Sequence, residues 1–465
     1  MDTATSRKWG VLTGVGILSF LGCIDLTIVN TAAPDIRRDL GATVTQTQLA
    51  VNVFVVALSM FMVTAGRLSD RYGRRRVLYL GSVLFGLSSL GAGLAPGVVP
   101  LIAFRFLQGA ACAVLYTSSS TIVAGAFPEA QRGKAIGTLF AVNGIGLAIG
   151  PMLGGLIVGA LSWHWVFLIN VPLVLAALAI CSVSLAESRA TDASGGFDWP
   201  GLLLLMLGLA GLIFGVTFDD TFGWVSWPVL GSLGIGVAAL VAFVLVDRRA
   251  PHPLIPFRLL AGRRFLSAVT SEFGLAFFYT TALFLMPLYL SVVRGDGDVA
   301  IGLLMLPTTA TVAVLSPVVG RVVDRVGPRA VLITGFAALT ASALLQSRLG
   351  VGSGLAYVVV AFVLMGVGWA CVLGPSAVMA LSAVPPRLSG LAVGATWTFH
   401  NFGGAIGLAV SLTLFRAFGS VSPETFPAGN RAAMLLLTGT SLAALLVLVA
   451  LGLPRRRARH CSGAE

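Results

Sequence analysis

The chain has 465 residues, of which 57% are hydrophobic and 10% charged, and its mean hydropathy is +0.95. This composition excludes an ordinary soluble domain and predicts an all-α integral membrane protein. The formal net charge of +12 would indicate a polyanionic partner in a soluble protein. Here the loops that set membrane orientation account for the charge, so no nucleic-acid partner is expected.

Apolar runs of about 20 residues, the length that crosses the hydrocarbon of a bilayer, predict the transmembrane helices. Fourteen such spans are expected near 11–33, 47–65, 77–95, 99–124, 135–160, 165–185, 200–218, 227–246, 265–291, 299–319, 330–347, 354–379, 391–415 and 431–453. The predicted organisation is a first six-helix bundle in 1–186, a linker with two extra helices in 187–264, a second six-helix bundle in 265–454 and a basic tail in 455–465. A short amphipathic stretch around 255–260 is expected to lie on the membrane surface.

Two short polar segments share one pattern. Gly66 to Arg76 carries five arginines and one aspartate in eleven positions, and a looser copy runs from Gly320 to Arg329. Short loops rich in arginine stay on the cytoplasmic side, which places both hinges and both termini there. We expect the hinges to act as a conformational latch in which Asp70 pairs with arginines or with a helix N-terminus across the bundle interface. The alternative is a charge cluster that serves topology alone. The latch residues are Gly66, Asp70, Arg71, Gly73, Arg74, Arg75, Asp324 and Arg325.

Asp25 lies in the middle of the first span. A carboxylate at that depth is costly unless it is protonated, paired or facing a wet cavity, and burial favours the protonated form, as a reversible proton carrier requires. The alternative is a static pair that holds helices together. Arg105, in the fourth span, is the natural partner, unless it extends to the nearby membrane boundary.

Glu272, early in the ninth span, is the other acid well inside an apolar run, and we expect it either to carry protons or to contact substrate. Other polar or aromatic residues in the spans are candidates for lining a cavity, although interhelical contact would equally explain them. These candidates are Asn30, Gln108, Tyr116, Tyr279, His400 and Asn401. The fifth span places a predicted bend beside a close helix contact, through Gly146, Gly150, Pro151, Gly154 and Gly155.

Several functional classes lack support in the sequence. The chain has no Gly-x-x-x-x-Gly-Lys-Ser/Thr run and no segment long enough for a nucleotide-binding domain, so ATP is not expected to drive transport. The five cysteines show no metal-ligand spacing. No Ser-His-Asp constellation stands out either. The predictions are therefore no metal, no cofactor and no enzymatic activity, with any transport driven by an ion gradient.

The motifs, in this order, resemble the major facilitator superfamily and specifically its fourteen-span drug:proton antiporters. The hinge resembles the signature loop after the second span, Arg105 to Gly109 the proton-transfer motif of the fourth, and the glycines around Pro151 the antiporter motif of the fifth. Further matches are Asp25 with Thr27, Asn30 and Pro34, the run Trp163-x-Trp165-x-Phe167-x-Ile169-Asn170-x-Pro172, and Asp198 to Gly201. The chain departs from the family at His164, where arginine is frequent, and by having no acid between Ile301 and Val319.

This resemblance implies two six-helix bundles that rock about a central cavity, with Asp25, Arg105, Glu272 and His400 around it. The implied function is proton-coupled export of amphipathic drugs or antibiotics by a multi-pass monomer of the bacterial inner membrane, with small amphipathic substrates, protons and lipid as its partners. One alternative is a dedicated exporter of a single endogenous metabolite, such as an antibiotic or a siderophore. A more distant one is a membrane sensor that transports nothing.

Overall fold

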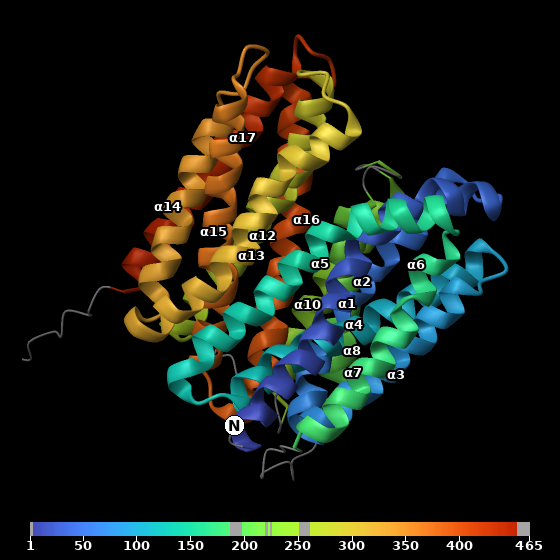
Figure 1. Cartoon of the computed structure of the whole chain (residues 1–465), viewed down its shortest axis with the longest axis vertical. Helices are drawn as coiled ribbons and strands as arrows, with labels where there is room; N and C mark the ends of the chain where they lie inside the picture. Colours follow the sequence, from blue (N-terminus) through green and yellow to red (C-terminus); the bar gives the residue numbers. More distant parts are fainter. Residues whose placement is uncertain (1–2, 187–197, 219–221, 224–225, 251–260, 453–465) are drawn as a thin grey trace, which may run out of the picture.

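The computed structural model describes residues 3–186, 198–218, 222–223, 226–250 and 261–452, and its regular elements are helices (Figure 1). The first bundle comprises α1 (Thr3–Asp39), α2 (Val44–Tyr72), α3 (Arg74–Gly93), α4 (Val98–Ala126), α5 (Arg132–Ala160), α6 (His164–Leu168) and α7 (Asn170–Ser184). Two further helices follow, α8 (Trp199–Thr217) and α10 (Trp227–Asp247). The second bundle comprises α12 (Arg263–Val292), α13 (Asp298–Val326), α14 (Pro328–Gln346), α15 (Leu355–Ser382), α16 (Ser389–Phe418) and α17 (Phe426–Ala450).

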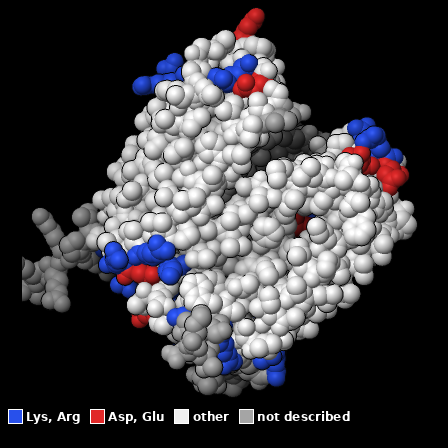
Figure 2. Space-filling view, in the orientation of Figure 1, with Lys and Arg blue, Asp and Glu red and all other residues white. Residues whose placement is uncertain are grey.

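The described helices agree with the predicted all-α membrane fold. Thirteen of them are long and apolar enough to cross a bilayer, with α6 and α7 together forming one span, and α8 contributes a shorter apolar helix. Figure 2 shows charged side chains gathered toward the ends of the molecule, with a middle zone almost free of them. Such a zone is what the hydrocarbon of a membrane requires. The amphipathic stretch at 255–260 and the tail at 455–465 lie outside the described residues.

The two bundles form two lobes that meet at the end where the chain begins and diverge at the other end (Figure 1). The surface is hollowed between the lobes at the divergent end (Figure 2). Both arginine-rich hinges lie at the end where the lobes meet. Each hinge joins a helix of the seam, α2 or α13, to the next helix of its own bundle. We call this end the arginine-rich end.

Two helix crossings provide most of the seam between the bundles, α2 against α16 and α5 against α13. A Cβ atom on Gly66 would lie 2.1 Å from the carbonyl oxygen of Gly390. At the other crossing, a Cβ atom on Gly320 would lie 2.2 Å from the carbonyl oxygen of Gly133. Backbone therefore touches backbone at both crossings, and a larger residue has no room. The repetition matches the two copies of the hinge in the sequence.

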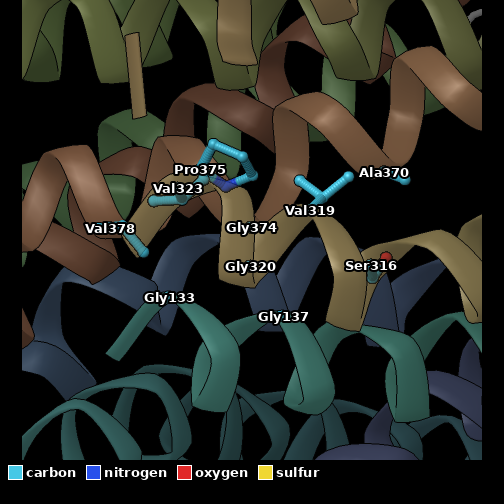
Figure 3. Close-up of a pocket in the computed structure, with 10 residues that line it drawn as sticks. All are labelled: Gly133, Gly137, Ser316, Val319, Gly320, Val323, Ala370, Gly374, Pro375 and Val378. Atoms are coloured by element: carbon cyan, nitrogen blue, oxygen red, sulfur yellow. The ribbon is translucent and has the colours of Figure 1, made fainter. Parts of the chain in front are cut away.

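Figure 3 shows the α5–α13 crossing, where Gly133 and Gly137 face Ser316 and Gly320. The gap beside it, with Gly374 on a third wall, is too narrow for a water molecule. The seam at this end is therefore closed by packing as well as by polar contacts.

The extra helix α8 lies against the seam, and α10 packs on α8. Leu202, Leu205 and Leu209 of α8 pack with Val63 of α2 and Leu391 of α16, so one helix contacts both bundles. The motif that begins α8 has a local explanation, because Asp198 accepts a hydrogen bond from the backbone N–H of Gly201 and caps the helix.

Replacing Gly320 with valine is expected to hold the arginine-rich end apart, because the new Cβ would meet backbone rather than a movable side chain. Overpacking of this kind costs about 1–3 kcal/mol, which shifts a conformational equilibrium by about 5- to 150-fold. Spin labels on cysteines placed at the exposed positions Ala130 and Arg321, in a cysteine-free background, would report a longer mean distance.

The matched control is Gly302→Val on the same helix, where a Cβ atom would meet nothing within 4 Å. Equal distance distributions in the two variants would contradict the assignment of Gly320 to the seam.

Candidate functional site

Asp25 and Arg105 form an ion pair inside the first bundle, between an Nη1 of Arg105 and Oδ2 of Asp25. Asp25 is fully buried and Arg105 is 1% exposed. The other carboxylate oxygen, Oδ1, accepts hydrogen bonds from Nε2 of Gln108 at 3.0 Å and Nδ2 of Asn170 at 3.3 Å. Arg105 therefore does not extend to the membrane boundary. Its charge is compensated within the protein.

A second layer of contacts holds this pair. The Ser89 hydroxyl accepts from Gln108 at 3.1 Å and from Asn170 at 2.9 Å, and it donates to the carbonyl of Phe167. Arg105 Nε donates to the carbonyl of Ala50, and its guanidinium lies 4.3 Å from the ring centroid of Phe54. A guanidinium over an aromatic face is stabilised by the negative electrostatic potential of the ring.

The sequence did not point to Ser89, and Asn170 appeared only as part of a motif without a role. The hydrogen-bond partners of Asp25 come from α4 and α7 of its own bundle. The structure therefore places Asp25 and Arg105 in the interior of the first bundle, whereas the resemblance placed them around a cavity shared with Glu272 and His400. The difference arises because four polar side chains on α3, α4 and α7 turn toward α1.

Glu272 and His400 form the corresponding site of the second bundle. Their side chains are 3% and 4% exposed, and Nδ1 of His400 lies 2.7 Å from Oε2 of Glu272. The Ser376 hydroxyl donates to the other carboxylate oxygen. The second ring nitrogen of His400 lies 3.1 Å from the Tyr279 hydroxyl. A continuous hydrogen-bonded chain thus joins Glu272 through His400 to Tyr279.

Aromatic rings surround the end of this chain and join the two bundles. Tyr279 stacks on Trp369 at 4.4 Å between centroids, while Tyr116 of α4 stacks on Trp397 of α16 at 5.1 Å. Phe140 of α5 also lies against Trp397, at 6.3 Å. We call these five residues the aromatic seam. Within the described part of the chain, the buried indole N–H of Trp369 has no hydrogen-bond partner.

The remaining cavity candidates are placed differently. Tyr116 is buried and its hydroxyl lies 2.9 Å from the Cys23 sulfur, two residues from Asp25 on α1. Gln108 belongs to the Asp25 cluster. Asn401 is half-buried and follows His400, with an amide nitrogen that has no partner among the described residues. Asn30 is exposed.

Three glycines of the fifth span approach α1, whereas the sequence predicted a close helix contact without identifying the partner helix. A Cβ atom on Gly150 would lie 1.9 Å from the Thr27 hydroxyl oxygen, and one on Gly154 would lie 2.1 Å from that of Thr31. Gly146 approaches Phe20 in the same way. Gly155 does not take part, since a Cβ atom there would meet nothing within 4 Å. Pro151 lies inside α5 on its exposed side.

The hinges meet the opposite bundle through their aspartates. The two carboxylate oxygens of Asp70 accept hydrogen bonds from the backbone N–H groups of Gly390 and Leu391, each at 3.0 Å. These N–H groups belong to the first turn of α16, where they have no intrahelical acceptor and the helix dipole is positive. Asp70 is thus the side-chain cap of a helix in the second bundle.

Asp324 does the same in the opposite direction. Its carboxylate accepts from the N–H groups of Gly133 at 2.7 Å and Lys134 at 3.0 Å, at the start of α5 in the first bundle. Two equivalent carboxylates therefore cap helices across the seam.

The other hinge residues have supporting positions. Arg74 lies 3.8 Å from Asp70 and donates to the carbonyl of Pro386, just before α16. Arg71 and Arg75 lie over the rings of Tyr72 and Tyr79. Gly73 has φ of 101°, a backbone conformation that glycine adopts readily and that lets α2 turn into α3. Arg325 is exposed.

Comparison with known proteins agrees with this architecture. The sequence model of the Major Facilitator Superfamily matches residues 15–408. The chain belongs to this superfamily. It is 33% identical to the "Tetracenomycin C resistance and export protein" of Streptomyces glaucescens, over 91% of this chain and 79% of that one. It is 32% identical to the "Multidrug resistance protein Stp" of Mycobacterium tuberculosis, over 89% of this chain and 76% of that one.

A solved structure shares the fold of this superfamily member. The crystal structure of the human organic anion transporter MFSD10 superposes with a TM-score of 0.68 at 17% identity, covering 95% of this chain and 99% of that one. Membership of the superfamily and these bacterial relatives show that the chain is a multi-pass membrane transporter rather than an enzyme. Its relatives are named for resistance to drugs and antibiotics and for export.

Removing Arg105 alone is expected to destabilise the protein strongly, because it leaves the Asp25 carboxylate buried without a cation. Breaking such a pair costs about 3–5 kcal/mol, whereas replacing both partners is often nearly neutral. Thermal unfolding in detergent should therefore show a large loss for Arg105→Gln and substantial recovery for Asp25→Asn/Arg105→Gln.

The same double-mutant cycle on the exposed pair Asp35 and Arg38 should give a coupling below about 1 kcal/mol. Additive effects of the Asp25 and Arg105 substitutions would contradict the buried ion pair.

Asp70→Asn is expected to lower the transport rate while membrane insertion stays intact, because an amide caps two N–H groups poorly and charge-assisted hydrogen bonds are worth about 1.5–3 kcal/mol each. Asp324→Asn should behave in the same way. Transport would be measured in vesicles with matched protein levels, with Asp296→Asn, on an acid paired with Arg294, as control. Wild-type transport by both hinge variants would leave the hinges with a topological role alone.

Proposed function

We propose that this transporter exports amphipathic compounds in exchange for protons, by alternating access. The observation that carries the proposal is the buried pair of Asp25 and Arg105. A permanent cation favours the charged form of a carboxylate, whereas burial opposes it, so a small change in the distance between the two groups changes the proton affinity of Asp25. A proton arriving from outside neutralises Asp25 and weakens its attraction to Arg105.

The geometry offers a route from Asp25 to the seam. Asp25 and Cys23 lie on α1, and Cys23 contacts the Tyr116 hydroxyl. Tyr116 is on the same helix as Arg105 and stacks on Trp397 of the second bundle. A movement of α1 against α4 that separates the ion pair would therefore disturb a contact between the bundles. This connection supports coupling between protonation of Asp25 and rocking of the bundles.

The aromatic seam supports an amphipathic substrate. Its rings offer flat apolar faces, while the Trp369 N–H and the chain from Glu272 through His400 to Tyr279 offer polar partners. Ligand sites commonly combine an apolar lining with a few fixed polar groups. Protonation of the Glu272–His400 pair would change the charge next to the substrate. The proton and the substrate thus favour different states, which is the condition for coupled exchange.

The latch supports the same cycle. With both aspartates capping helices across the seam, the arginine-rich end is closed and the divergent end is open. Release of the two caps would allow the opposite arrangement. With the hinges on the cytoplasmic side, as their arginines predict, the observed state faces outward.

A dedicated exporter of one compound is the second candidate, because one relative is named for a single antibiotic and the other for multiple drugs. Expression in a sensitive host, challenged with a panel of unrelated toxins, separates the two. Resistance to a single chemical type favours the dedicated exporter, and resistance to several favours the multidrug pump.

Asp25→Asn is expected to lower the rate of substrate transport driven by a pH gradient in everted membrane vesicles at least about tenfold. General acid-base and charge-pair functions contribute effects of this size or more. The matched control is Asp35→Asn, which changes an acid on the same helix that is part of an exposed pair with Arg38. Equal pH-driven transport by wild type and Asp25→Asn would contradict the proposal.

A further inference from the structure

A second pocket opens at the arginine-rich end of the second bundle, apart from the seam, with the exposed residues Arg263 and Arg264 in its lining. It has a volume of about 390 Å³, within the range of about 300–1,000 Å³ typical of ligand sites. Helices α12, α14 and α15 and the residue after α17 form its walls, with the lining residues Arg263, Arg264, Ser267, Gly327, Pro328, Arg329, Met379, Ser382 and Leu451.

The lining is strongly positive. Three of its nine residues are arginines, and none of the nine is Asp or Glu. Arg329 is held in position, because its Nη2 donates to the carbonyls of Leu448 and Val449 near the end of α17. Guanidinium groups that share a pocket repel one another, and an anion between them removes that repulsion.

Two helices begin at this pocket and add to its positive potential. Helix α12 starts at Arg263 and α14 at Pro328, and neither has a side-chain cap on its first N–H groups. Glycines, Gly262 and Gly327, precede them. Uncapped helix N-termini favour anions, as the positive end of each helix dipole lies there. The arginines and the helix starts thus both favour an anionic ligand.

The first bundle provides a contrast at its own arginine-rich end. Trp9 lies edge-on to Phe127 with centroids 5.5 Å apart, Lys8 lies over the Phe127 ring and Lys134 over the Trp9 ring. Arg7 donates to the carbonyl of Ser184 at the end of α7, as Arg329 does at α17. Lys8, Lys134 and Arg7 of the first bundle thus contact rings or a carbonyl one by one, whereas three arginines of the second bundle line a single pocket.

We propose that this pocket binds the phosphate group of an anionic ligand. Arginine forks match phosphate oxygens, and basic pockets between transmembrane helices bind the headgroups of anionic lipids. The lining also includes the apolar side chains of Met379 and Leu451, and the nearby Leu266 is 43% exposed. A phosphate next to apolar surface at the end of a membrane helix fits an anionic phospholipid such as phosphatidylglycerol.

The test uses the full-length protein in a neutral detergent and native mass spectrometry of bound phosphatidylglycerol, with phosphatidylcholine as the neutral lipid. Arg263→Gln/Arg264→Gln is the pocket variant. Arg321→Gln/Arg387→Gln is the matched control, since both residues are exposed and neither lines the pocket. Each arginine near an anionic lipid is worth about fivefold in affinity, so the pocket variant should bind phosphatidylglycerol about 25-fold more weakly.

The control variant is expected to bind phosphatidylglycerol as the wild type does. An equal loss in both variants, or equal binding of the two lipids by the wild type, would overturn the proposal. Competition with inorganic phosphate identifies the source of the ligand. If millimolar phosphate displaces the lipid from the wild type but does not displace the residual lipid from the pocket variant, the ligand is a soluble phosphate. Retention of the lipid supports the phospholipid.

Discussion

Two carboxylates hold the two bundles together, because each one caps the start of a helix in the bundle opposite its own. Asp70 caps α16 and Asp324 caps α5, each through two backbone N–H groups. Such caps are strong because a charged acceptor meets unsatisfied donors at the positive end of a helix. They also need close approach, which the glycine pairs at both crossings allow. The caps and the glycines therefore act together, and the same arrangement occurs at both crossings.

Each bundle compensates the unfavourable burial of its acid with different polar partners. Asp25 has a permanent cation and two amide donors, whereas Glu272 has a histidine and a serine hydroxyl. Under the proposed exchange, protonation of Asp25 would remove the ion pair with Arg105. In the second arrangement, a proton would move between two titratable groups without leaving the site. We propose that the two acids serve different steps, Asp25 the conformational change and Glu272 the charge beside the substrate.

Sequence patterns predicted the helices and their order, because a bilayer imposes one length and one composition on every span. They also predicted that Asp25 would pair with Arg105, since a buried charge in membrane needs a partner. They did not join Glu272 to His400, which are 128 residues apart. Contacts of that kind depend on the rotation of each helix about its axis. The sequence around Ser89, Ser376 and Trp369 does not indicate this rotation. Gly155 fits its motif, yet a Cβ atom there would meet nothing within 4 Å, for the same reason.

Substrate-induced proton release from the purified protein tests the central claim most directly, because exchange requires that substrate and proton bind to different states of one transporter. In weakly buffered detergent solution, adding a transported compound to the wild type is predicted to release protons, in an amount that saturates with the substrate. Asp25→Asn should release fewer protons while Asp35→Asn releases as many as the wild type. Saturable substrate binding by the wild type without any proton release would contradict the account.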